Sequence, residues 1–118
     1  MKYLCMVYVD EKKLDAMSEA ENAALDARSL AYDDVLREGR HFIAAQALQN
    51  VASATTLRIR SGKVTLTDGP FAETHEQLGG FLLIDAKDLN EAIQLASKIP
   101  AMQLGCIEVR PIKEIKRA

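Results

Sequence analysis

The sequence predicts an α+β domain that spans residues 1–118, and three observations support this prediction. Strand-like apolar segments, helix-capping signals and a glycine turn alternate along the chain. Their order is β-α-β, then a β-hairpin, then β-α-β. This is the order of the ferredoxin-like fold, in which four antiparallel strands carry two helices on one face. A length of 118 residues fits one such domain, since domains mostly have roughly 100–150 residues.

The first two strands are apolar on both faces. Residues 2–9 alternate between two apolar sets, one with Leu4, Met6 and Tyr8 and the other with Tyr3, Cys5, Val7 and Val9. Residues 41–49 repeat this pattern. A half-exposed strand has one polar face, so we expect both strands to be covered on both sides.

A helix over residues 19–38 is predicted between these strands. Ser18 and Glu21 form a capping box, and Gly39 offers the left-handed conformation that ends many helices. We expect the buried face to consist of small and aliphatic residues at helical spacing, namely Ala24, Ala27, Leu30, Ala31, Val35 and Leu36. The side expected to face solvent carries Arg28, Asp33, Asp34, Arg37 and Glu38.

The second half begins with a hairpin of residues 55–60 and 63–67, joined by Ser61-Gly62. Its arginines, Arg58 and Arg60, are expected to be exposed. A buried strand over 79–84 follows, and then a helix that Asp88 caps and Pro100 limits. This helix is expected to pack through Leu89, Ala92, Ile93 and Ala96. The polar alternation of the last strand, 106–110, suits the edge of a sheet or an interface.

Core packing alone does not explain the segment 67–80. Asp68, Gly69 and Pro70 together predict a turn. Phe71 is expected to anchor the segment to the core. The pair Gly79-Gly80 indicates a bulge or a close backbone approach, by packing or by a ligand.

His75 is the sharpest candidate for chemistry, because an imidazole titrates near neutral pH. Asp68, Glu73 or Glu76 would orient the imidazole or adjust its pKa for proton transfer. Asp68 and His75 are therefore the candidate catalytic residues, and an exposed loop histidine is the alternative. The candidate ligand-binding residues around them are Gly69, Pro70, Phe71, Glu73, Glu76, Gly79 and Gly80.

Composition argues against several classes of function. The net charge of −2 is spread along the chain, and the few aromatic residues do not alternate with Lys or Arg, so nucleic acid is not expected as a ligand. No apolar run approaches the roughly 20 residues that cross a bilayer, and a soluble cytoplasmic protein is expected. Cys5 and Cys106 lack partners at zinc-ligand spacing and are expected to be buried, reduced thiols. Neither a metal nor a cofactor is expected.

The fold and the two-faced strands together predict an assembly. Two helices cover one face of a ferredoxin-like sheet, which leaves several hundred square ångströms of apolar surface on the other. We expect a homodimer in which the two sheets pack against each other.

The segments Asp68–Glu73, Glu76–Gly80 and Ile107–Pro111, with the opening Met1–Cys5, resemble the DGPF branch of the YCII-related family. The resemblance covers nearly the whole chain. It implies a ferredoxin-like dimeric α/β barrel, but no established reaction. Members of this branch often occur beside sigma factors of the extracytoplasmic-function type, which implies a link to regulation.

The chain departs from the family pattern at two points. The resemblance implies a histidine on the first helix that acts with an aspartate, and Arg28 and Tyr32 occur here without any histidine. The family commonly has a lysine at the position of His75. Asp68 is therefore the better candidate for a role shared across the family.

Three functions remain open from the sequence. The first is a homodimer that binds an unknown small molecule near residues 68–80, with or without acid–base catalysis. The second is a regulatory module that binds a partner protein through the hairpin and the loop. In the third, residues 68–80 only clamp the dimer interface.

Overall fold

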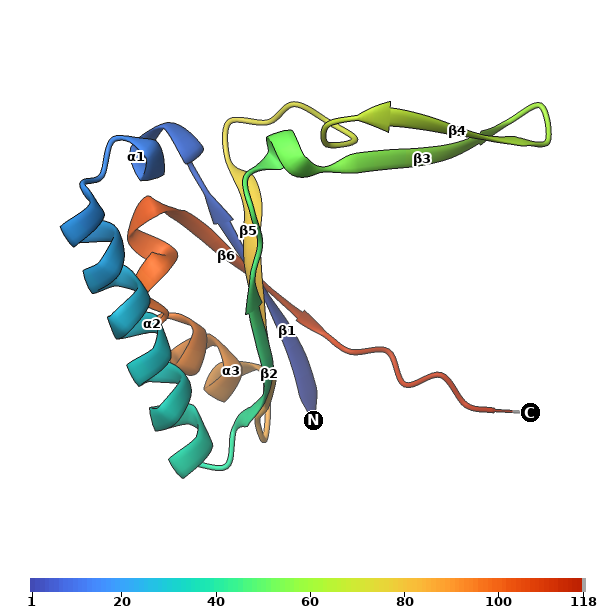
Figure 1. Ribbon diagram of the computed structural model, residues 1–118. Helices are drawn as coiled ribbons and strands as arrows, with labels where there is room; N and C mark the ends of the chain where they lie inside the picture. Colours follow the sequence, from blue (N-terminus) through green and yellow to red (C-terminus); the bar gives the residue numbers. More distant parts are fainter. Residues whose placement is uncertain (118) are drawn as a thin grey trace.

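The strands and helices follow the predicted order, with one short helix added after the first strand (Figure 1). The computed structural model describes residues 1–117. Short 3-10 turns at Val51–Ser53 and Pro100–Leu104 precede the third and the last strand. The elements are β1 (Lys2–Val9), α1 (Glu11–Asp15), α2 (Glu19–Glu38), β2 (Phe42–Ala47), β3 (Thr55–Arg60), β4 (Lys63–Asp68), β5 (Gln77–Asp85), α3 (Leu89–Ala96) and β6 (Gly105–Pro111).

Four of the strands form one antiparallel sheet in the order β2-β5-β1-β6. The helices α2 and α3 lie on one face of this sheet (Figure 1). This topology is the ferredoxin-like arrangement that the order of elements predicts. β6 is an edge strand, as the alternation of Glu108 and Arg110 predicts.

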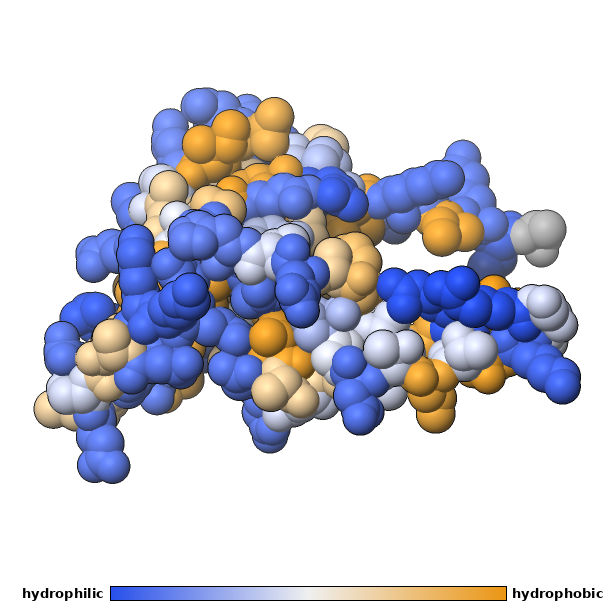
Figure 2. Space-filling view, turned by 90° about the horizontal axis from the view of Figure 1, so that it is seen from above, coloured by the Kyte–Doolittle hydropathy of each residue, from blue (hydrophilic) through white to orange (hydrophobic). Residues whose placement is uncertain are grey.

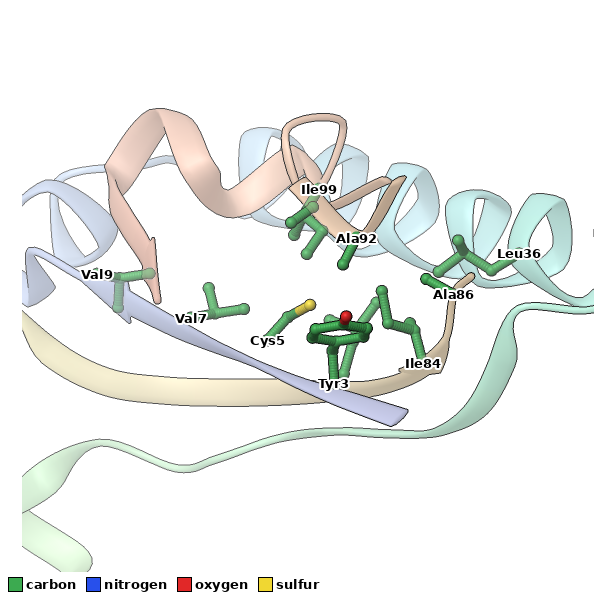
Figure 3. Packing of buried hydrophobic residues seen from close by; sticks show 11 residues of the cluster. Tyr3, Cys5, Val7, Val9, Leu36, Ile84, Ala86, Ala92 and Ile99 are labelled. Carbon is green, nitrogen blue, oxygen red and sulfur yellow. The ribbon is translucent and has the colours of Figure 1, made fainter. Parts of the chain in front are cut away.

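The core fills the space between the sheet and the helices (Figure 3). One parity of β1 is fully buried there, and the other parity, Leu4, Met6 and Tyr8, is half-buried on the face without helices. The buried cluster consists of Tyr3, Cys5, Val7, Val9, Leu36, Leu82, Ile84, Ala86, Ala92, Ala96 and Ile99.

The bounds of α2 and its capping box are confirmed, but of the residues predicted for the buried face only Leu36 is buried. Leu25 and Leu36 are the buried residues of α2, and Tyr32 packs against the core beside them. The side chains that were expected inside are exposed at Ala24, Ala27, Leu30, Ala31 and Val35. Turning the larger side chains inward buries more apolar area than turning the alanines inward.

The prediction for α3 holds in part. Ala92 and Ala96 are buried, whereas Leu89 and Ile93 are about half exposed. The short α3 turns Ala92 and Ala96 onto the sheet, with Leu95 partly buried against the same core. The hydroxyl of Tyr32 connects α3 to α2 by donating to the carbonyl of Leu95. Of the helices in residues 1–117, none combines the length and apolarity needed to cross a bilayer.

The left-handed residue after α2 is Arg40, with φ of 62°, and not the predicted Gly39, whose φ is −80°. A Cβ at residue 39 would lie 2.9 Å from Cδ2 of His41, so a larger residue there would need the imidazole to shift. Close approach to His41, rather than backbone conformation, accounts for this glycine.

The predicted hairpin is confirmed as a separate two-stranded sheet of β3 and β4. Its turn has positive φ at both Ser61 and Gly62, which suits a tight two-residue connection. The hairpin projects away from the face of the sheet that the helices leave open (Figure 1).

Candidate functional site

Gly79 and Gly80 lie in β5 where this strand passes close to its neighbours. A Cβ at Gly80 would lie 2.8 Å from the carbonyl oxygen of Gln46, a backbone atom of β2. A Cβ at Gly79 would lie 3.0 Å from Cγ2 of Val9 in β1. The glycine pair therefore serves close packing, one of its predicted roles. The register between β1 and β5 also shifts here, with Val7 opposite Gly80 and Tyr8 opposite Leu78, in agreement with the predicted bulge.

The predicted turn forms at the base of the hairpin. Gly69 has φ of 99°, donates its N–H to the carbonyl of Ala54 at 2.7 Å and accepts from the hydroxyl of Thr56 at 2.8 Å. Asp68 ends β4, where its backbone pairs with Thr55. The Asp68 side chain is exposed and makes no hydrogen bond within residues 1–117, and Glu73 is also exposed.

Phe71 does not anchor the segment to the core, contrary to the prediction. Its side chain is 79% exposed, and only its carbonyl is engaged, accepting from Nη2 of Arg58 at 3.2 Å. The hairpin leads the chain away from the sheet, so Phe71 lies out of reach of the core. Pro70 beside it is half-buried.

His75 faces Asp10, a residue from another part of the chain. Nε2 of His75 lies 3.5 Å from Oδ2 of Asp10. Asp10 is only 7% exposed, and its Oδ1 caps α1 by accepting from the N–H of Lys12 at 3.0 Å. The imidazole itself is 82% exposed. A fixed carboxylate beside an accessible imidazole can orient the ring.

Glu76 accepts a hydrogen bond from the Cys106 thiol, with the two atoms 3.2 Å apart. This bond to the carboxylate raises the pKa of Cys106 above its usual value. Cys106 is exposed, which corrects the expectation that both thiols are buried. Both cysteines are free, although their strands are neighbours. Cys5 faces the helices, and Cys106, which pairs with Tyr8, lies on the opposite face.

A cavity of about 470 Å³ lies between α2 and the β2–β5 side of the sheet. Gly79 and Gly80 form part of its wall, but Asp68 and His75 do not. Ser29 and Asp33 of α2 supply polar groups, and partial burial raises the pKa of Asp33. The apolar part of the lining includes Val7, Leu30, Ala45, Leu82 and Ile99.

Comparison with known proteins places the chain in a family. A model of the YCII-related domain matches residues 1–116. The chain belongs to the YCII-related family. An uncharacterised protein of Rhizobium meliloti (strain 1021) is 38% identical over 120 residues, which cover 95% of this chain and 92% of that protein.

A solved structure shares the fold of this YCII-related chain. It is 5-chloro-2-hydroxyhydroquinone dehydrochlorinase from Burkholderia phenoliruptrix AC1100, in complex with 2,5-dihydroxybenzoquinone. The TM-score is 0.55 at 17% identity, over 96% of this chain and 94% of the other. This likeness concerns the fold.

Sequence reasoning missed two residues of this YCII-related chain. Asp10 could have been found from the sequence as a helix cap, because it is an acidic residue directly after a buried strand. Asp33 was assigned to the solvated side of its helix, yet it lines the cavity and is half-buried. Its position follows from how α2 is rotated against the sheet.

Proposed function

We propose that this chain is a homodimeric small-molecule-binding protein whose ligand occupies the cavity between α2 and the sheet. The cavity is the observation on which this proposal rests. Its volume of about 470 Å³ falls within the roughly 300–1,000 Å³ typical of small-molecule sites, and a few polar groups interrupt mostly apolar walls. Gly79 and Gly80 connect it to the predicted ligand-binding segment.

The proposal extends to acid–base chemistry. Partial burial in the cavity wall raises the pKa of Asp33 above its usual value. His75 is a second group suited to proton transfer, and Asp10 takes the orienting role predicted for Asp68, Glu73 or Glu76. Shifted or paired titratable groups of this kind are enriched at functional sites.

Two finer assignments accompany this function. We place the chain in the DGPF branch of its family, on the motif from Asp68 to Glu73 and the Gly79-Gly80 pair. We also propose that it acts in the cytoplasm.

The test is a ligand screen followed by amide chemical shifts. A panel of small aromatic acids, amines and quinones that includes 2,5-dihydroxybenzoquinone is the probe, since the structural neighbour holds that quinone. We expect the shifts to cluster on cavity-lining residues. Ser29→Leu fills the cavity from α2 and should abolish them, and Ala27→Leu, on the exposed side of α2, should not.

Two results would contradict the proposal. One is a panel that leaves every amide shift unchanged. The other is a set of shifts that persists in Ser29→Leu, because the ligand would then bind elsewhere. Loss of binding in Ala27→Leu as well would trace the effect to the helix rather than to the cavity.

The second candidate function is a non-catalytic regulatory or protein-interaction module, associated with transcription through sigma-factor systems. The observation that favours it is the amount of aliphatic surface on the hairpin. Such a module would need no cavity ligand, and the screen separates the two functions.

A further inference from the structure

The hairpin β3–β4 is amphipathic across its two faces. The register pairs Leu57 with Leu66 and Ile59 with Val64, which puts the four aliphatic side chains on one face. They are 62–76% exposed. The opposite face carries Arg58, Arg60 and Lys63. Figure 2, seen from above, shows strongly hydrophilic side chains along the hairpin and hydrophobic ones at its margins.

We infer that this hairpin is an arm whose aliphatic face packs against a second copy of the chain. Within one subunit the arm has no such support. It forms its own sheet and stands clear of the rest of the molecule (Figure 1). An isolated two-stranded hairpin is marginally stable in water, and several hundred square ångströms of exposed aliphatic surface indicate an interface.

The overall shape is extended, because both the arm and the segment after β6 project from the body (Figure 1). The radius of gyration is 16.3 Å, against about 13 Å for a compact domain of roughly this length. The arm extends from the end of the sheet on the side that the helices leave open, so it borders the space in front of the open sheet face (Figure 1). A body that packs on the sheet therefore also comes to lie against the arm.

A second copy fits this space because it supplies the matching surface. The open face of the sheet is lined by half-buried apolar side chains, including Leu4, Met6, Phe81 and Leu83. Stable interfaces bury about 800 Å² on each partner, and a second copy that contacts both the arm and the sheet face would cover more surface than one that contacts the sheet face alone. The role of the arm rests on the proposed homodimer. It adds that the hairpin is the element that contacts the partner.

The distribution of charge along the chain also favours a second copy as the partner of the arm. Residues 55–68 contain three basic residues and one acid, a net charge of +2. The rest of the chain has twelve basic and sixteen acidic residues, a net charge of −4. A basic arm is attracted to the acidic body of a second copy, whereas an anionic membrane would repel that body.

The test compares two neighbouring residues on opposite faces of β4. Leu66→Gln changes the aliphatic face, and Thr67→Gln changes the polar face. Sedimentation velocity over a dilution series gives the dimer dissociation constant. We expect Leu66→Gln to raise it at least about tenfold, because each dimer loses two buried leucines, and Thr67→Gln to leave it unchanged. Leu66 is exposed in the monomer, so circular dichroism should show an intact fold.

Each other outcome has a definite meaning. If Leu66→Gln does not weaken the dimer, the inference about the arm is wrong, and the proposed homodimer is retained. A wild-type monomer at every concentration overturns both. Binding to phosphatidylcholine–phosphatidylserine vesicles that Leu66→Gln abolishes, with no dimer formed, would identify a membrane as the surface that the arm contacts and would also overturn the inference.

Discussion

Two thiols in this chain are protected from reaction for different physical reasons. Cys5 is buried among the core side chains, and burial raises its pKa to about 11. Cys106 is exposed, but its hydrogen bond to Glu76 favours the protonated thiol. Since the thiolate is the nucleophile, both should react slowly with alkylating reagents.

Glu76→Ala should speed the alkylation of Cys106. Without the carboxylate the pKa of Cys106 falls toward its usual value, so a larger fraction is thiolate at about pH 8. Iodoacetamide labelling followed by mass spectrometry measures the rate at each cysteine. Cys5 should stay protected in the same sample, and Glu73→Ala, which removes an exposed carboxylate, should have no effect. An unchanged Cys106 rate in Glu76→Ala would contradict the role of the hydrogen bond.

The chemistry of single residues was only partly predictable, because it depends on partners far away in the sequence. His75 was found from its residue type, but its partner Asp10 directly follows β1. Phe71 has the composition of an anchor, and its exposure follows from the direction of the hairpin. Local patterns identify groups that can react, and tertiary structure decides which of them meet.

The approach of β5 to β2 is set by the absence of a side chain at Gly80. The clash that a Cβ would make there is with the backbone of Gln46 and Ala47, which is held by the pairing of the two strands. The neighbouring Gly79 would meet the end of the Val9 side chain, which can shift. The two glycines should therefore tolerate substitution very differently.

Gly80→Ala should lower the free energy of unfolding by roughly 1–3 kcal/mol, the usual range for overpacking. Gly79→Ala should be close to neutral, because reduced freedom of the unfolded chain contributes about 0.4–1 kcal/mol in the opposite direction. Urea unfolding measures the free energy of unfolding of both variants, provided that its slope with urea concentration is unchanged from wild type. Equal losses in the two variants would show that the backbone of β2 does not set the constraint.

Elements were predicted best where the signal is local. The capping box of Ser18 and Glu21 fixed the start of α2, and Ser61-Gly62 fixed the turn of the hairpin. Apart from Leu36, the buried face of α2 was predicted wrongly, because alanines at helical spacing define a face without showing that it packs. α1 was not predicted, since five residues are too few for a periodic pattern.

The hairpin and the open sheet face give the molecule two surfaces that a single subunit does not cover. A hairpin held only by its own strand pairing should open often, whereas the strands over the core should open rarely. Association would couple the stability of the hairpin to protein concentration.

Amide hydrogen exchange should therefore depend on concentration in the hairpin. In wild-type protein, residues 55–68 should exchange slowly at high concentration and much faster after dilution below the dimer dissociation constant. Amides of β1, over the buried core, should be protected in both samples. Mass spectrometry of peptic fragments provides the measurement. Equal exchange of the hairpin at both concentrations would mean that association does not cover it.

The order of elements and the topology of the sheet followed from the sequence, because hydrophobic period and turn residues are local. The direction of the hairpin did not follow, because it depends on the two connections that join the arm to the sheet. The homodimer remains a prediction, which the apolar open face supports and the solution experiments test.

The separation of the hairpin from the four-stranded sheet also bears on evolution. Among residues 1–117 its strands pair only with each other, so residues can be gained or lost near the tip without disturbing the register of the sheet. Side chains alternate between the two faces, and an unmatched single insertion would exchange the aliphatic and basic sides beyond it. Relatives with longer or shorter arms should therefore differ by matched insertions in both strands, which preserve the pairing of Leu57 with Leu66.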